Sequence, residues 1–103
     1  MTDSARSVRG VQIRLTSERW LHIVEHHDDL AGHYHDVLAT VAAPDVVYEG
    51  DGGELLAVAK RFVPRYLVVA YRELSQSDGF VITAFFTTRF SQIERRRLVW
   101  TRP

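Results

Sequence analysis

The chain contains no cysteine, and this absence excludes several kinds of site. Without thiols there is no disulfide framework, no zinc ribbon and no thiol nucleophile. Long apolar runs are also missing: no stretch approaches the ~18 residues of a membrane-spanning helix, and the polar start MTDSARS lacks a signal-peptide core. We therefore expect a cytoplasmic protein that does not associate with membranes.

What is present is the composition of one globular domain. The 103 residues are 46% apolar and 11% aromatic, which is enough for a single hydrophobic core but not for two. We therefore expect residues 1–103 to fold as one unit.

The net charge is zero, but the charges are unevenly distributed. Residues 1–54 hold four basic and ten acidic side chains, whereas residues 55–103 hold nine basic and three acidic ones. Eight of those nine are arginine, whose planar guanidinium suits phosphate. The split favours a phosphate-binding face. The alternative is that the two halves attract each other, within the fold or across a dimer contact.

The first half has the pattern of a strand followed by two helices. Apolar and polar residues alternate over 11–15, which is typical of a half-buried strand. Thr16 is a good N-cap for a helix from about 17 to 27. Apolar residues at helical spacing predict a second helix over 29–42, and Pro44 marks its end.

The second half changes to the pattern of strands. Five segments rich in β-branched and aromatic residues are separated by turn signals such as DGG and SQSDG: 46–50, 54–62, 65–73, 79–87 and 95–101. Short connections favour antiparallel neighbours. The predicted fold class is α+β, with two N-terminal helices packed on one face of a four- to five-stranded antiparallel sheet.

One face of this sheet should stay partly open. In the segment 79–87, strict alternation would turn an apolar set toward the helices, namely Phe80, Ile82, Ala84 and Phe86. Thr83 and Thr87 would then lie on the open face, together with Arg72 from the preceding strand and one of Lys60 or Arg61.

Several segments carry a resemblance to a known family: RLTSERWLHIVEHHDDL (14–30), PDVVYEGDGGELLAV (44–58), YLVVAYRE (66–73), GFVITAFFTT (79–88) and RRRLVW (95–100). The chain resembles the phage-associated branch of the barnase–EndoU–colicin–RelE (BECR) nuclease superfamily. The resemblance implies helices packed on a four- or five-stranded antiparallel sheet. It also implies cofactor-free, metal-independent RNA cleavage on the exposed sheet face. His22 and His27 match the pattern, while Phe85 stands where tyrosine is common.

The segment HIVEHH (22–27) raises the question of a metal. His22 and His26 share a helix face, and H-x-x-E-H is the inverted zinc-peptidase motif. That site needs a further acidic ligand on a partner helix, but the carboxylates after position 54 fall in loops or at strand ends. We therefore predict no metal. His22 is alternatively a buried histidine that supports the helix–sheet contact. His27 closes the first helix, where the helix dipole favours a cationic imidazole.

The candidate residues fall into two groups, each with a plainer alternative. Those assigned to catalysis are His27, Lys60, Arg72 and Thr83. Those assigned to RNA binding are His22, Arg61, Thr87, Arg95 and Arg96. The alternatives are strand-edge charges for the lysine and Arg61, a surface ion pair for Arg72, ordinary strand residues for the threonines, and a solvated turn for the RRR run at 95–97.

The leading functional hypothesis is an RNA endonuclease, either the toxin of a toxin–antitoxin pair or a phage-derived module. RNA supplies its own nucleophile, the 2′-hydroxyl, so the protein needs only to move protons and stabilise charge. The expected partners are RNA, an antitoxin or immunity protein, and a second copy in a homodimer. The alternative is a non-catalytic RNA-binding or protein-interaction module on the same fold. A histidine metal site of another function is a third hypothesis.

Overall fold

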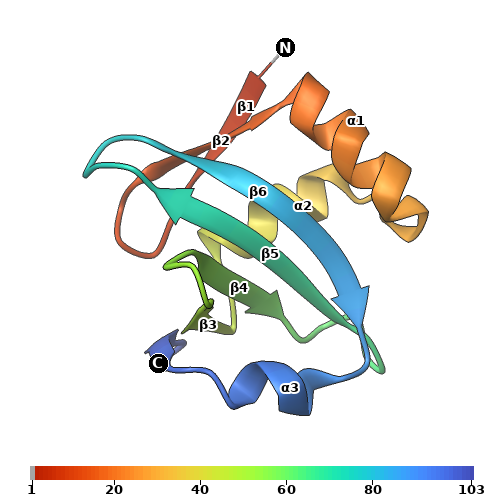
Figure 1. Cartoon of the computed structure of the whole chain (residues 1–103), viewed down its shortest axis with the longest axis vertical. Helices are drawn as coiled ribbons and strands as arrows, with labels where there is room; N and C mark the ends of the chain where they lie inside the picture. The colour runs from red at the N-terminus through yellow and green to blue at the C-terminus, as the bar shows by residue number, and fades with distance from the viewer. Residues whose placement is uncertain (1) are drawn as a thin grey trace.

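A computed structural model describes residues 2–103 and shows an α+β fold in which one seven-stranded sheet carries three α-helices (Figure 1). The elements in chain order are β1 (Thr2–Arg6), β2 (Gln12–Thr16), α1 (Ser17–His26), a 3₁₀ turn (Asp28–Leu30), α2 (Tyr34–Ala42), β3 (Val46–Glu49), β4 (Leu55–Ala59), β5 (Tyr66–Glu73), β6 (Gly79–Thr87), α3 (Phe90–Glu94) and β7 (Leu98–Thr101).

The sheet is larger than predicted and is mixed. Its strand order is β1-β2-β6-β5-β4-β3-β7, and every neighbouring pair is antiparallel except β2 and β6, which run parallel. The α+β class is confirmed, but the prediction of four to five purely antiparallel strands was wrong. The extra strand β1 is polar and largely exposed at the sheet edge, so no hydrophobic alternation marks it in the sequence.

The helices also differ from the prediction. Thr16 caps α1, because its side-chain oxygen accepts a hydrogen bond from the Arg19 N–H at 3.0 Å. The second helix begins only at Tyr34, because Gly32 adopts a positive φ of 86° and separates it from the 3₁₀ turn. The hairpin β1–β2 precedes both helices and α3 follows the long strands, so an arrangement of just two N-terminal helices was wrong.

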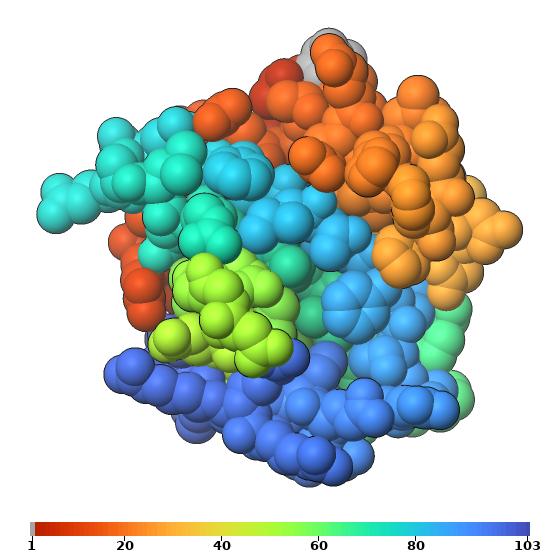
Figure 2. All heavy atoms as spheres, viewed as in Figure 1, coloured from red at the N-terminus to blue at the C-terminus, as the bar shows by residue number. Residues whose placement is uncertain are grey.

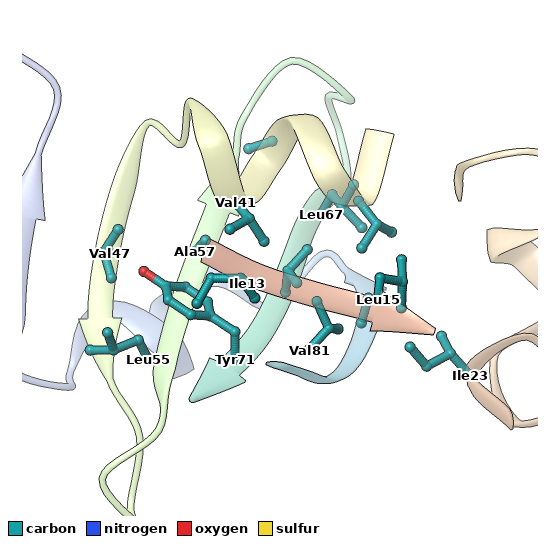
Figure 3. Packing of buried hydrophobic residues seen from close by; sticks show 14 of the residues in the cluster. Ile13, Leu15, Ile23, Val41, Val47, Leu55, Ala57, Leu67, Tyr71 and Val81 are labelled. Carbon is teal, nitrogen blue, oxygen red and sulfur yellow. The ribbon is translucent and has the colours of Figure 1, made fainter. Parts of the chain in front are cut away.

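The main core lies between the sheet and helices α1 and α2. Ile23 of α1 and Val41 of α2 are fully buried against Leu15, Leu67 and other strand side chains (Figure 3). In Figure 1, α2 lies behind the sheet. A smaller apolar cluster on the opposite face includes Ile93 of α3. Because α3 is short, it covers only part of that face.

A bulge in β6 changes which side chains face the core. Ala70 pairs with Thr83 but Tyr71 pairs with Val81, so one extra residue, Ile82, is inserted. Val81 is consequently buried in the main core, and Ile82 packs with the smaller cluster, contrary to the strict alternation that the sequence suggested. Beyond the bulge the expected pattern resumes, so that Thr83 lies on the open face.

Candidate functional site

The open face of the sheet contains a hollow of about 310 Å³, here called the sheet cavity. Its apolar floor comes from strands β4 to β6 and from α3, with Leu56, Ala70, Phe85 and Ile93. Polar groups surround this floor: Glu54, Thr83, Thr87, Arg89, Gln92 and Arg96, with Gly50 beside them. In Figure 2 the recessed middle of this face is bordered by the 50–54 turn (yellow-green) and α3 (blue). Apolar floors with a few convergent polar groups are typical of ligand sites.

A second hollow of about 250 Å³, the histidine hollow, lies beside it between α1 and β6. It is lined by Arg19, His22, Ile23, His26, His27, Ile82 and Thr83. Thr83 therefore lines both hollows. The rings of His27 and Phe85 have their centroids 6.1 Å apart, which links the two hollows a second time. The two hollows therefore adjoin at Thr83, and together they are called the track.

The structure brings together five of the nine sequence-predicted residues. His22, His27 and Thr83 line the histidine hollow, and Thr83, Thr87 and Arg96 line the sheet cavity. His22 is exposed, whereas the sequence left open that it is a buried helix–sheet contact. His27 is half-buried.

The other four predicted residues lie outside both hollows. Arg72 donates a hydrogen bond to the carbonyl of Gly52 at 3.1 Å, at the edge of the open face. Lys60 lies over the Phe90 ring, 5.1 Å from its centroid. Arg61 and Arg95 lie away from the two hollows. Arg61 bonds Asp36 of α2 at 2.8 Å on the helix-covered side, and Arg95 is exposed.

The uneven charge of the two halves has a structural explanation. Within residues 2–103, all seven arginine–carboxylate ion pairs join residues 1–54 to residues 55–103: Arg9–Glu73, Arg14–Asp78, Arg61–Asp36, Arg65–Asp29, Arg96–Asp51, Arg97–Glu49 and Arg102–Asp45. Most of the arginines are therefore paired with carboxylates within the fold, as the alternative interpretation of the charge pattern proposed. The five without a carboxylate partner in this part of the chain are Arg6, Arg19, Arg72, Arg89 and Arg95.

Two of these five arginines line the hollows. Arg19 lies in the histidine hollow and Arg89 in the sheet cavity, one on each side of Thr83. Neither was a sequence-predicted site residue. Arg89 was missed because α3, which follows it, was not foreseen, and Arg19 because its position in the first turn of α1 carries no motif. An unpaired guanidinium in a hollow is available to bind an anion.

The 50–54 turn forms one wall of the sheet cavity. Asp51 pairs with Arg96 at 2.7 Å, and this guanidinium holds the pKa of the Asp51 carboxyl below its ordinary value. Glu54 accepts a hydrogen bond from the Gly52 N–H at 2.8 Å. A Cβ at Gly50 would lie 2.7 Å from both carboxylate oxygens of Glu54, so glycine permits this close approach. Sequence reasoning missed Glu54, although the run GDGGE indicated a tight turn.

The paired histidines of α1 have no third metal-binding side chain grouped with them among residues 2–103. Their rings are 4.4 Å apart between centroids, and Nδ1 of His26 lies 2.9 Å from the carbonyl of His22. Because a carbonyl only accepts, that nitrogen carries the hydrogen. No group of three histidine, aspartate or glutamate side chains in the described part of the chain is placed to hold a metal ion. The absence of a bound metal stays a prediction.

Comparison with protein-family models, curated proteins and solved structures finds no match to this chain. The resemblance to the BECR nucleases therefore stays a prediction. No helix between residues 2 and 103 has the length and apolar character needed to cross a membrane.

Proposed function

We propose that the chain is a metal-independent RNA endonuclease that cleaves through the ribose 2′-hydroxyl on the open face of the sheet. The observation that carries this proposal is the position of Thr83 between two hollows. The histidines lie in one hollow, and each of the two hollows contains at least one arginine. RNA cleavage by this route needs a proton acceptor, a proton donor and a cation near the phosphate. All three kinds of group line the track.

His27 is the proposed general base or acid, because an imidazole titrates near neutral pH and serves either role after a small shift. Its half-buried ring lies beside Phe85 at the junction of the hollows. Glu54 is the carboxylate of the sheet cavity and provides a second group that can exchange a proton.

The charge that develops on the phosphate is assigned to Arg89 and Arg96, which line the sheet cavity. The sequence had suggested Lys60 or Arg72 for this role, and both lie outside the cavity lining. Arg72, at the edge of the same face, would instead contact a neighbouring phosphate after releasing the Gly52 carbonyl. Thr83 would donate a hydrogen bond to a non-bridging phosphate oxygen or to the ribose.

The test is cleavage of a labelled RNA pool in excess chelator, with the ends of the products identified. Products should end in a 2′,3′-cyclic phosphate. A positioned acid or base is worth ~10²–10⁴-fold in rate, so His27→Ala should lose cleavage by about that factor. It should keep its fold and most of its RNA affinity. His35→Ala is the matched control, because His35 is exposed on α2 and lines neither hollow.

A second candidate function is a non-catalytic RNA-binding module. Phe85 favours it, because this position in the cavity lining has no hydroxyl group. If the wild-type protein leaves RNA intact across the pH range from acidic to alkaline but binds it, this second function replaces the first. As a nuclease, the protein would act as a toxin or a phage-derived module, with an antitoxin or immunity protein as its partner.

A further inference from the structure

We propose that the histidine hollow is a second phosphate subsite, which binds the backbone phosphate next to the one in the sheet cavity and binds it more tightly at acidic pH. The ligand class is a single-stranded nucleic acid segment with at least two phosphodiesters. The inference rests on the proposed function in placing the first phosphate in the sheet cavity.

Arg19 provides the permanent charge of this subsite. It is half-buried in the hollow and has no carboxylate partner among residues 2–103, whereas seven of the twelve arginines have one. The capping bond from its backbone N–H to Thr16 fixes where the side chain leaves the helix. A half-buried guanidinium with no carboxylate partner can donate a charge-assisted hydrogen bond to a phosphate oxygen.

His22 and His26 provide a charge that depends on pH. Both are exposed, and their rings lie 4.4 Å apart between centroids on the same helix face. Nδ1 of His26 is engaged by the His22 carbonyl, which leaves Nε2 for the solvent side. When both rings are protonated they repel each other, and an anion beside the pair reduces this repulsion. Phosphate binding should therefore strengthen as the pH falls.

The charged groups around the hollow leave this positive character intact. No carboxylate from residues 2–103 lines the hollow, although Glu18 shares a neighbouring hollow with Arg19 and His22. On α1 itself, Glu25 is exposed. The neighbouring 3₁₀ turn carries Asp28 and Asp29, and Asp29 lies 3.9 Å from Arg65. On the adjacent strands, Arg14 of β2 is paired with Asp78, and β6 carries no charged residue.

The two subsites are joined in a way that suits an unpaired strand. Thr83 lines both hollows, so one hydroxyl lies between the two phosphate positions. The Phe85 ring lies at the same junction and is half-buried. An aromatic face beside a cationic track is how proteins bind single strands, because an unpaired base stacks on the ring.

The test uses 2′-O-methyl oligonucleotides, which have no free 2′-hydroxyl and so report binding without cleavage. Fluorescence anisotropy would compare ligands with one, two and three phosphodiesters. The wild type should gain affinity between one and two phosphodiesters. Arg19→Gln should lose that gain and lower the salt slope of the longer ligands by about 0.7, the value of one phosphate contact on a single strand. Arg102→Gln is the matched control and should bind as the wild type does, because Arg102 is paired with Asp45 and lines neither hollow.

Measuring affinity as a function of pH separates the contribution of the histidines from that of Arg19. Wild-type affinity for the two-phosphodiester ligand should rise as the pH falls from 8 to about 5.5, through the range in which imidazoles gain a proton. The His22→Gln, His26→Gln double variant should keep the affinity at pH 8 and lose the larger part of this rise, while His27, which also lines the hollow, accounts for the remainder. Any one of three results would overturn the subsite. These are an unchanged salt slope in Arg19→Gln, an unchanged pH profile in the double variant, and no binding by the wild type.

The outcomes also distinguish this inference from the proposed function. Protein that shows the two-phosphate behaviour but never cleaves RNA supports the subsite and overturns the nuclease. Protein that cleaves RNA while Arg19→Gln binds normally overturns the subsite and leaves the nuclease in place.

Discussion

Replacing Tyr71 by phenylalanine should raise the stability of the protein. Tyr71 is fully buried in the main core, and its hydroxyl group has no hydrogen-bond partner among residues 2–103. Figure 3 shows the oxygen among apolar side chains, on the side of Val47. In the unfolded chain this hydroxyl bonds water, so folding removes a hydrogen bond without replacing it.

The expected gain follows from the cost of that loss. A buried polar group left without a partner costs roughly 1–3 kcal/mol, while phenylalanine keeps the shape of the ring and its packing. The free energy of unfolding of Tyr71→Phe should therefore rise by about 1 kcal/mol or more. For a domain of about 100 residues, 1 kcal/mol corresponds to a rise of roughly 4–8 °C in Tm.

The same hydroxyl predicts a change in the alkaline pH dependence. Burial raises the pKa of Tyr71 above its ordinary value, so the unfolded chain releases this proton near pH 10 while the folded chain keeps it. Below about pH 10 this proton does not change the free energy of unfolding. As the pH rises further, the free energy of unfolding falls by up to ~1.4 kcal/mol per pH unit. Tyr71→Phe should reduce this slope. Part of the slope should persist in this variant, because burial and the hydrogen bond to Asp3 raise the pKa of Tyr34 to about 12.

The assay is urea unfolding of the wild type and Tyr71→Phe at neutral pH and at several values between about pH 9 and about pH 11.5, with fluorescence as the probe. Tyr66→Phe is the matched control, because Tyr66 is half-buried and stacked on Phe90. It should change the free energy of unfolding at neutral pH only slightly. A Tyr71→Phe protein that is less stable than the wild type would refute the reasoning, because its hydroxyl would then have a partner in the folded state.

Three further outcomes are expected. Thr16→Ala removes the cap of α1 and should lower the free energy of unfolding by about 1 kcal/mol in urea, whereas Thr16→Ser should retain most of it. Gly79→Ala should cost about 1–3 kcal/mol in the same assay, because its Cβ would overlap the backbone carbonyl oxygen of Arg72 and would lie 2.6 Å from Cδ1 of Ile13, where β2 meets β6; equal stability would contradict this. Purified protein should contain no stoichiometric zinc by elemental analysis; zinc that is lost in His22→Ala or His26→Ala would contradict this.

The sequence alone determined the features that depend on near neighbours. The strand over 79–87 has the bounds that its β-branched and aromatic residues indicated, and Thr16 caps α1 as its side chain and position suggested. In β5 the alternation also holds, so Leu67 and Tyr71 face the main core. These features follow from propensity and periodicity, which act over a few residues.

Only the tertiary structure decided how distant segments meet. The parallel pairing of β2 with β6 and the bulge at Ile82 depend on backbone hydrogen bonds between residues far apart in the chain. The bulge reversed the predicted faces of Val81 and Ile82, because one inserted residue shifts a two-residue period by a full step.

The candidate site divides in the same way. The resemblance and the end of the first helix selected His27, the alternation of the strand selected Thr83, and the fold brings both together in one hollow. Residue type alone did not separate Arg19, which is left without a carboxylate, from Arg61, which is paired with Asp36. Whether a guanidinium is paired depends on which carboxylate the folded chain places within a few ångströms of it, and a linear pattern does not contain that distance.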